Sequence, residues 1–325
     1  MEAQKSGAHE QRKRLRAEQA GPLAKKIGGG IGDHFAATLG ATRLALAGAD
    51  IAHKVLGTSA MQAAARVAHE KFSAPLWTPE FPRAFWPKPA SSRGEGAPVL
   101  FFESCASRAM GPPRGDDSEI LREVAARVFL RAGFQLVTPE GQDELCCGQP
   151  FASKGLAETA ERKARELARG LAAQGGKIPV VFDTSPCAAR AKSFSGEDFA
   201  PLDLVEFLCS HVAPKLDLRP IEGPVALHIT CSVRKMGLAD MLLGLAQKCA
   251  RQVIAPADVK CCGFAGDKGF VTPELNDFAL RHLQESLPPE CREGYSTSRT
   301  CEIGLAAHSG RRYRSILHLL DRASA

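Results

Sequence analysis

Aromatic side chains are scarce in this sequence, which contains only two tryptophans and two tyrosines. Proteins that bind single-stranded nucleic acid stack bases on aromatic rings beside a basic groove. Here the basic residues that follow the first thirty positions are dispersed along the chain and form no such stripe. The net charge of +6 favours solubility and docking to an acidic partner or surface. We therefore expect no nucleic-acid partner.

Long apolar runs are also lacking. The most apolar stretch, 35–52, is interrupted by two threonines, an arginine and an aspartate, whereas a membrane helix needs about 20 predominantly apolar residues. The first residues are charged and polar, without the apolar segment of a secretory signal. We expect no transmembrane segment and a cytoplasmic location, either free or peripheral at the inner face of the membrane.

Two motifs of common cofactor sites are missing as well. No glycine-rich nucleotide loop follows a predicted strand: GGGIG at 28–32 opens a helical pattern but has no strand before it. We therefore expect no flavin site on this chain. No C-x₂-C pair occurs either, although this pair is the usual knuckle of zinc ribbons.

Cysteine, by contrast, is abundant, with 11 residues. An odd number of cysteines in a chain without a recognisable secretory signal argues against a disulfide framework. The cysteine content therefore favours metal or redox chemistry.

The sequence repeats itself from position 98 onward. PVLFFESCASRAMG in the first copy corresponds to PVALHITCSVRKMG in the second, with Cys105 and Cys231 at the same offset. A CCG triplet then follows in both copies. Each copy ends in one further cysteine, Cys187 in DTSPC and Cys301 in STSRTC.

Each copy opens with a short apolar run, then a turn and helical patterns, which predicts an α/β unit with a mostly parallel sheet. The fold class is therefore α/β, with two tandem pseudo-symmetric units behind a helical arm. We expect a disordered tail over 1–30, a helical arm and proline-rich linker over 31–97, a first unit over 98–215 and a second over 216–325. The arm is expected to form two helices around Gly57, and helices are predicted over 156–173 and 273–287.

Four cysteines of each copy are expected at the carboxyl ends of parallel strands, where sites in open α/β sheets gather. Adjacent cysteines do not easily form a disulfide with each other, but both can offer thiolates to a polynuclear cluster. Four thiolates suit an iron–sulfur cluster and also structural zinc. The candidate metal ligands are Cys105, Cys146, Cys147 and Cys187 in the first copy and Cys231, Cys261, Cys262 and Cys301 in the second.

Iron and sulfide are favoured over zinc by the residues around the CC pairs. Glycines at 148, 263, 266 and 269 would let backbone amides approach inorganic sulfide. Lys154 and Lys268 follow the pairs at equivalent places, where positive charge would offset an anionic cluster, and Arg108 and Arg234 are further candidates for this role. His228, on an apolar strand, is expected to be a core histidine rather than a ligand. Three cysteines have no counterpart in the other copy and are expected to fill core: Cys209, Cys249 and Cys291.

These residues resemble the CCG, or cysteine-rich, domain found in heterodisulfide reductase and related proteins. Stretches such as LCCGQPFASKG, KCCGFAGDKGFVTPELN and GYSTSRTCEIGLAAHSG are similar to the C-terminal region of FAD-linked, iron–sulfur D-lactate dehydrogenases. The resemblance implies the same two sets of four cysteines as cluster ligands. The first cysteine of the family's terminal C-x-x-C is replaced by Thr184 and Ser298, so a four-thiolate cluster, [4Fe–4S], with a hydroxyl in the vacated place is expected.

The resemblance implies an electron relay from flavin to a respiratory acceptor. The FAD would be held by a partner domain or subunit, with a ferredoxin-like domain and a quinone or cytochrome acceptor as further partners. The chain would then be an oxidoreductase component, not catalytically complete alone. The alternatives are a thiol/disulfide reductase component similar to the CCG subunit of heterodisulfide reductase and a zinc-stabilised interaction protein.

Overall fold

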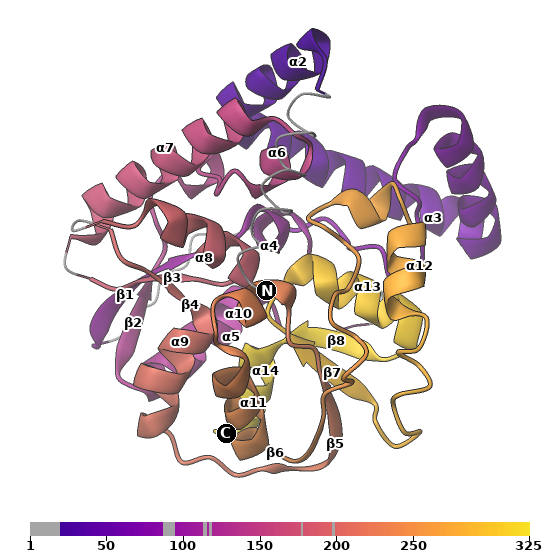
Figure 1. Cartoon of the computed structure of the whole chain (residues 1–325). Helices are drawn as coiled ribbons and strands as arrows, with labels where there is room; N and C mark the ends of the chain where they lie inside the picture. The colour runs from indigo at the N-terminus through magenta and orange to yellow at the C-terminus, as the bar shows by residue number, and fades with distance from the viewer. Residues whose placement is uncertain (1–19, 87–94, 113–115, 117–118, 177, 197–198) are drawn as a thin grey trace, which may run out of the picture.

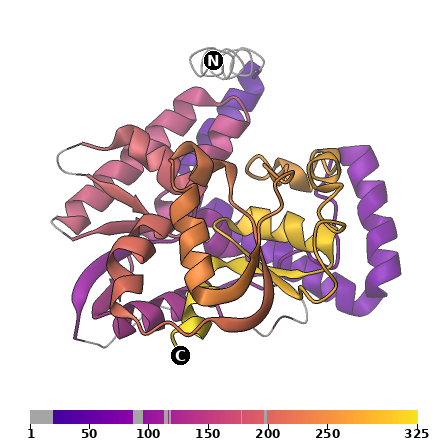
Figure 2. The ribbon, with the colours of Figure 1, turned by 60° about the horizontal axis from the view of Figure 1, so that its bottom comes forward.

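The computed structural model describes residues 20–86, 95–112, 116, 119–176, 178–196 and 199–325. Two α/β units lie side by side, and a helical arm from the N-terminal part packs on the first of them (Figure 1). In Figure 2, helix α2 of the arm and the C-terminus lie at opposite ends of the molecule. We call 98–215 unit 1 and 216–325 unit 2.

Each unit contains a four-stranded sheet in which all strands run parallel. The order is β2-β1-β3-β4 in unit 1 and β6-β5-β7-β8 in unit 2, so the two sheets have the same topology. This finding confirms the predicted α/β class and the tandem arrangement. The strands are β1 (Ala97–Phe102), β2 (Phe134–Val137), β3 (Val180–Phe182), β4 (Pro201–Asp203), β5 (Ile221–Leu227), β6 (Ala250–Ile254), β7 (Glu293–Ser296) and β8 (Arg312–Ser315).

Helices connect the strands and follow the same plan in both units. Unit 1 contains α4 (Cys105–Ala109), α5 (Leu121–Arg131), α6 (Gln149–Ser153), α7 (Ala157–Gly175), α8 (Ser185–Ala191) and α9 (Leu204–Phe207). Unit 2 contains α10 (Cys231–Lys235), α11 (Ala239–Cys249), α12 (Glu274–Leu280), α13 (Arg299–Ser309) and α14 (Ile316–Ala323). Short helical turns are η1 (Gln142–Glu144), η2 (Lys192–Phe194), η3 (Leu208–Val212), η4 (Ala213–Lys215) and η5 (Lys268–Phe270). The helix predicted over 273–287 is shorter than expected, because the chain breaks into turns after Leu280, ahead of two prolines that disfavour helix.

The arm consists of α2 (Pro22–Asp33) and α3 (Phe35–Phe72). Residues 1–19 of the predicted disordered tail lie outside the described residues, but 22–30 belong to α2, whose glycine-containing face packs on α7. Helix α3 is broken at Gly57, where φ is 76°, so the expected pair of helices is confirmed. The proline-rich segment then crosses both units: the Leu76 amide donates to the Phe270 carbonyl, and the Phe85 amide donates to the Ala109 carbonyl at 3.0 Å.

One hydrophobic core spans the two units. Helices of both units, α5, α9, α11 and α14, contact one another between the two sheets. Phe129 of unit 1 and Leu320 of unit 2 are both fully buried in this core. The burial of apolar surface is the main stabilising contribution in a chain of this size, so the shared core holds the two strand-end regions in a fixed relation.

Candidate metal centres

In unit 1 the four predicted cysteines converge at the carboxyl end of the sheet. Cys105 begins α4 directly after β1, with Ser104 as the N-cap whose hydroxyl accepts a bond from the Ser107 amide. Cys187 lies in α8 directly after β3, and its Sγ is 3.2 Å from Sγ of Cys147. Cys146 is in hydrogen-bond contact with both Cys105 and Cys147. The four thiols thus form a continuous chain of contacts.

Burial and mutual contact keep the unit 1 thiols protonated. Hydrogen bonding to Cys146, followed by burial, raises the pKa of Cys105 well above its usual value. The contact with Cys105 lowers the pKa of Cys146, but the contact with Cys147 and burial outweigh it and raise this pKa to about 12. Metal ligands must be deprotonated, so a bound cation would release these protons and supply the missing positive charge.

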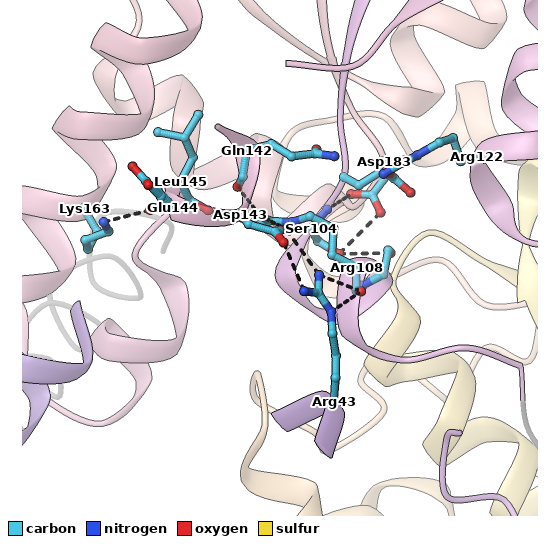
Figure 3. A network of polar contacts seen from close by, with 12 residues as sticks. Arg43, Ser104, Arg108, Arg122, Gln142, Asp143, Glu144, Leu145, Lys163 and Asp183 are labelled. Atoms are coloured by element: carbon cyan, nitrogen blue, oxygen red, sulfur yellow. Dashed lines mark hydrogen bonds and ion pairs between the residues drawn. The ribbon is translucent and has the colours of Figure 1, made fainter. Parts of the chain in front are cut away.

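A buried arginine lies beside the unit 1 thiols. Arg108 on α4 is fully buried and lies over the Phe102 ring, 5.3 Å from its centroid. Its Nη2 donates to the Leu145 carbonyl at 2.8 Å, and Nη1 pairs with Asp143 at 3.2 Å (Figure 3). Nε is buried and has no hydrogen-bond partner among the described residues. An unpartnered donor on a buried cation fits an anionic group bound nearby.

The arm fixes this arginine from outside, as Figure 3 shows. Arg43 of α3 donates through Nε to the Arg108 carbonyl at 3.3 Å and through Nη1 to Asp143 at 3.0 Å. This contact was not predicted from the sequence. The available signal was a single cation, Arg43, in the most apolar stretch of the sequence.

The glycine of each CCG triplet is required by the backbone. Gly148 has a φ of 81°, and a Cβ there would lie 2.1 Å from the Ala160 carbonyl oxygen of α7; Gly263 has a φ of 78° and the same close approach to Leu275 of α12. Each glycine amide is 3.4 Å from the Sγ of the first cysteine of its pair and donates to it. The sequence predicts that these glycines let sulfide approach, which stays a prediction; the structure shows that they let the next helix approach.

In unit 2 the four cysteines also converge, but they are more exposed. Cys231 begins α10 after the Thr230 N-cap, and Sγ of Cys262 is 2.8 Å from Sγ of Cys301. Cys231 and Cys261 are exposed, whereas Cys262 and Cys301 are buried. The contact with Cys231 lowers the pKa of Cys261 to about 2.

A histidine lies with the buried thiols of unit 2. One ring nitrogen of His228, Sγ of Cys262 and Sγ of Cys301 all lie within 4.8 Å of one another. The contact with Cys262 and then that with His228 lower the pKa of Cys301, burial opposes them, and the result is about 6. His228 is buried as expected, but its surroundings differ from the expected apolar core, because it lies among donor atoms.

The two hydroxyls predicted in the vacated ligand place differ in their contacts. Both precede the helix that carries the fourth cysteine, α8 or α13. Ser298 hydrogen-bonds to Cys301 and thereby contributes to lowering its pKa. Thr184 instead donates to the Ser104 hydroxyl at 3.2 Å.

The cationic residues that the sequence predicts beside the cysteine sites differ in their contacts and exposure. Lys154 forms an ion pair with Asp267, which joins the two CCG loops; both side chains are about half exposed, so the pair contributes little stability. Lys268 follows Asp267 and begins η5. Arg234 on α10 is exposed, unlike its counterpart Arg108. The cysteines expected to fill core do so: Cys249 and Cys291 are fully buried, and Cys209 is partly buried.

Helices that carry cysteines of the two sites contact each other across the boundary between the units. Helix α10 contacts α8, and α13 contacts α4. The Ser185 amide of unit 1 donates to the Thr297 carbonyl of unit 2 at 3.0 Å. A cleft at this boundary is lined by residues of both units, among them Asp183 and Glu302, and burial raises the pKa of each of these two carboxyls to about 7.

Comparison with known protein families agrees with this geometry. A family model described as a cysteine-rich domain, CCG, matches residues 99–190, which include the four thiols of unit 1. No helix among the described residues is long and apolar enough to span a membrane. A CCG domain fits an iron–sulfur electron-transfer role in a redox enzyme. The chain therefore contains a CCG cysteine-rich domain at 99–190.

Proposed function

We propose that this chain is the iron–sulfur electron-transfer module of a flavin-dependent 2-hydroxyacid dehydrogenase, with D-lactate as the substrate of the complete enzyme. The observation that carries the proposal is the convergence of two sets of four thiols, each set with two members on helices and two in the CCG loop. The proposed ligands are Cys105, Cys146, Cys147 and Cys187 in unit 1 and Cys231, Cys261, Cys262 and Cys301 in unit 2.

The donor atoms fit an iron–sulfur cluster. Four thiols in mutual contact, three of them buried in unit 1, need a cation to balance their charge once deprotonated. Iron–sulfur clusters bind through four thiolates, whereas mononuclear zinc in a Cys₄ site favours C-x₂-C spacing. When bound, the clusters would supply one-electron transfer, most simply as [4Fe–4S] centres.

The residues of the chain would tune this electron transfer. Buried thiols exclude water from unit 1, and the Arg108 cation stabilises added negative charge, which raises a reduction potential. Contact between α8 and α10 brings the two sites together, so an electron could pass from one unit to the other within this chain.

A partner would supply the electrons. Several apolar side chains on α3 are exposed, among them Leu44, Ile51 and Val55. Exposed apolar surface of this kind supports docking with another domain or subunit. The proposed partners are a flavin-containing dehydrogenase domain or subunit, a ferredoxin-like domain and a quinone or cytochrome acceptor.

The cofactor proposal is tested on the full chain purified without oxygen. We expect brown protein that contains iron and acid-labile sulfide in equal amounts and whose visible absorption bleaches on reduction with dithionite. Colourless protein with stoichiometric zinc would falsify the electron-transfer role.

The substrate proposal needs a second experiment. D-lactate alone should leave the absorption of the oxidised chain unchanged, since no flavin site is expected here. D-lactate together with a D-lactate-oxidising flavoprotein should bleach it, and L-lactate should not. Equal bleaching with both isomers would exclude specificity for D-lactate.

A zinc-stabilised interaction protein is the second candidate, because one specific group favours it. His228, Cys262 and Cys301 are a donor set that structural zinc also accepts. Metal analysis of variants that retain only one site distinguishes the candidates: zinc in unit 2 with iron in unit 1 would mean that unit 2 is structural.

A further inference from the structure

Two neighbouring strands of unit 2, β5 and β7, end at a pair of polar residues that unit 1 lacks, His228 and Ser296. His228 of PVALHITC occupies the position of Phe102 in PVLFFESC. On the neighbouring strand, Ser296 occupies the position of Phe182, as the pairing of β5 with β7 and of β1 with β3 indicates. In unit 1 the two phenylalanine rings pack with their centroids 5.1 Å apart.

This polar pair is buried and incompletely hydrogen-bonded. His228 is 3% exposed and Ser296 is fully buried. Neither Nε2 of His228 nor Oγ of Ser296 has a hydrogen-bond partner among the described residues. A buried polar atom without a partner is destabilising, so a histidine that merely filled core would be less favourable here than the phenylalanine of unit 1.

The His228 ring lies among metal-binding atoms. Its ring nitrogen is within 4.8 Å of Sγ of both Cys262 and Cys301, the two buried thiols of unit 2. The strand holds it there, because its amide donates to the Tyr295 carbonyl at 2.9 Å. Phe102 packs in one cluster with Cys147 and Cys187, so the position borders the fourth thiol in both units.

We propose that His228 is a direct nitrogen ligand of the metal centre of unit 2, which is therefore a mixed histidine–cysteine site, whereas that of unit 1 is bound by thiolates alone. The inference rests on the proposed function for the presence of metal in unit 2. A neutral imidazole adds no negative charge to the site. This suits unit 2, because Arg234 is exposed and does not supply the buried positive charge that Arg108 supplies in unit 1. Histidine ligation of an iron–sulfur centre raises its reduction potential relative to thiolate.

The test uses full-length protein with the unit 1 site removed by Cys146→Ser and Cys147→Ser. The chain is labelled with ¹⁵N-histidine, reduced and studied by pulsed electron paramagnetic resonance. We expect a strong hyperfine coupling to one histidine nitrogen. His228→Phe, which restores the residue of unit 1, should abolish this coupling while the iron content falls less than twofold, because four thiolates remain.

Matched variants separate ligation from folding. His308 lies on α13 but pairs with Asp277, so His308→Phe should leave the coupling unchanged. The reciprocal variant Phe102→His, made with the unit 2 site removed, tests whether the position itself creates the coupling. Only weak coupling, of the size expected through a hydrogen bond, would overturn the proposal, as would coupling that persists in His228→Phe.

The metal found in unit 2 shows whether the ligand assignment of His228 or the proposed electron-transfer role fails. If unit 2 holds zinc, X-ray absorption at the zinc edge should still show one nitrogen beside the sulfur ligands, and the electron-transfer role of unit 2 fails while the ligand assignment stands. If unit 2 binds no metal while unit 1 binds iron, the assignment of His228 is wrong and the electron-transfer role of unit 1 stands.

Discussion

Unit 1 and unit 2 share their strand order and the placement of four cysteines, yet the surroundings of the two sites differ. Unit 1 has a buried cation, Arg108, and an aromatic ring, Phe102, beside largely buried thiols. Unit 2 has exposed thiols at Cys231 and Cys261 and a buried imidazole at His228. The shared topology positions the donor atoms, whereas the residues that surround these atoms differ between the units.

The largest expected effect comes from removing one site at a time. Cys146→Ser with Cys147→Ser should lower the iron and sulfide content to about half, because the unit 1 thiolates are lost while those of unit 2 remain. Cys261→Ser with Cys262→Ser should have the same effect on unit 2. Chemical analysis of iron and sulfide measures both, with Cys209→Ser as the control. Complete loss of iron in either pair would mean that the chain has one shared centre.

A buried ion pair distinguishes the units energetically. Glu103 accepts from Nε of Arg122 at 2.5 Å, and both side chains are buried, whereas unit 2 has Ile229 in the place of Glu103. Arg122→Leu should lower the free energy of unfolding by about 3–5 kcal/mol, since it leaves a buried carboxylate without its partner. Urea unfolding measures the change. The double variant Glu103→Ile with Arg122→Leu should be close to wild type; equal loss in both variants would show that packing, and not charge, matters.

Substitution of the CCG glycines tests a backbone feature that both units share, the close approach of the next helix. Gly148→Ala and Gly263→Ala should each destabilise the fold by about 3 kcal/mol, because both combine a positive φ with a backbone clash. Gly244→Ala in α11 is the control: a Cβ there meets nothing within 4 Å, so it should stabilise the helix by up to about 1 kcal/mol. Thermal unfolding followed by circular dichroism gives the comparison. A tolerated alanine at either CCG glycine would contradict the packing of α7 and α12.

The smallest effect concerns a helix cap. Asp203 caps α9, accepts from the Val205 amide at 2.8 Å, and burial raises its pKa to about 6; the equivalent cap of α14 is Ser315. The unfolded carboxyl has a pKa of about 3.9, so folding disfavours its charged form. The stability contribution should fall by about 2–3 kcal/mol as the pH rises from about 4 to 6.

Asp203→Ser adopts the cap of unit 2 and should remove this part of the pH dependence. Urea unfolding at several pH values measures the difference between variant and wild type, so other titrating groups cancel. Parallel curves for the two proteins would show that Asp203 is not the titrating group.

The repeat in the sequence was sufficient to predict much of the fold. Strand-to-turn patterns at Cys105 and Cys231 placed both cysteines at strand ends, and parallel pairing then required the quartets to meet. The sequence pattern did not predict where the helix expected over 273–287 ends. Helix α12 ends at Leu280 because turns and two prolines follow, and hydrophobic periodicity does not predict such a boundary.

Contacts between distant elements were not predictable in the same way. Lys154 forms an ion pair with Asp267 of the other unit, and Arg43 of the arm donates a hydrogen bond to the Arg108 carbonyl. The apolar strand around His228 predicts a core residue. The repeat aligns this histidine with Phe102, but only the structure shows that both residues lie beside the buried thiols of their units.

We propose that the chain holds two inequivalent iron–sulfur centres, one in each unit. A Mössbauer spectrum of full-length protein loaded with ⁵⁷Fe without oxygen would resolve the two centres. We expect two sets of signals with equal iron, one of which disappears when Cys146 and Cys147 are replaced by serine. A single set of signals that accounts for all iron, or no cluster iron at all, would contradict the proposal.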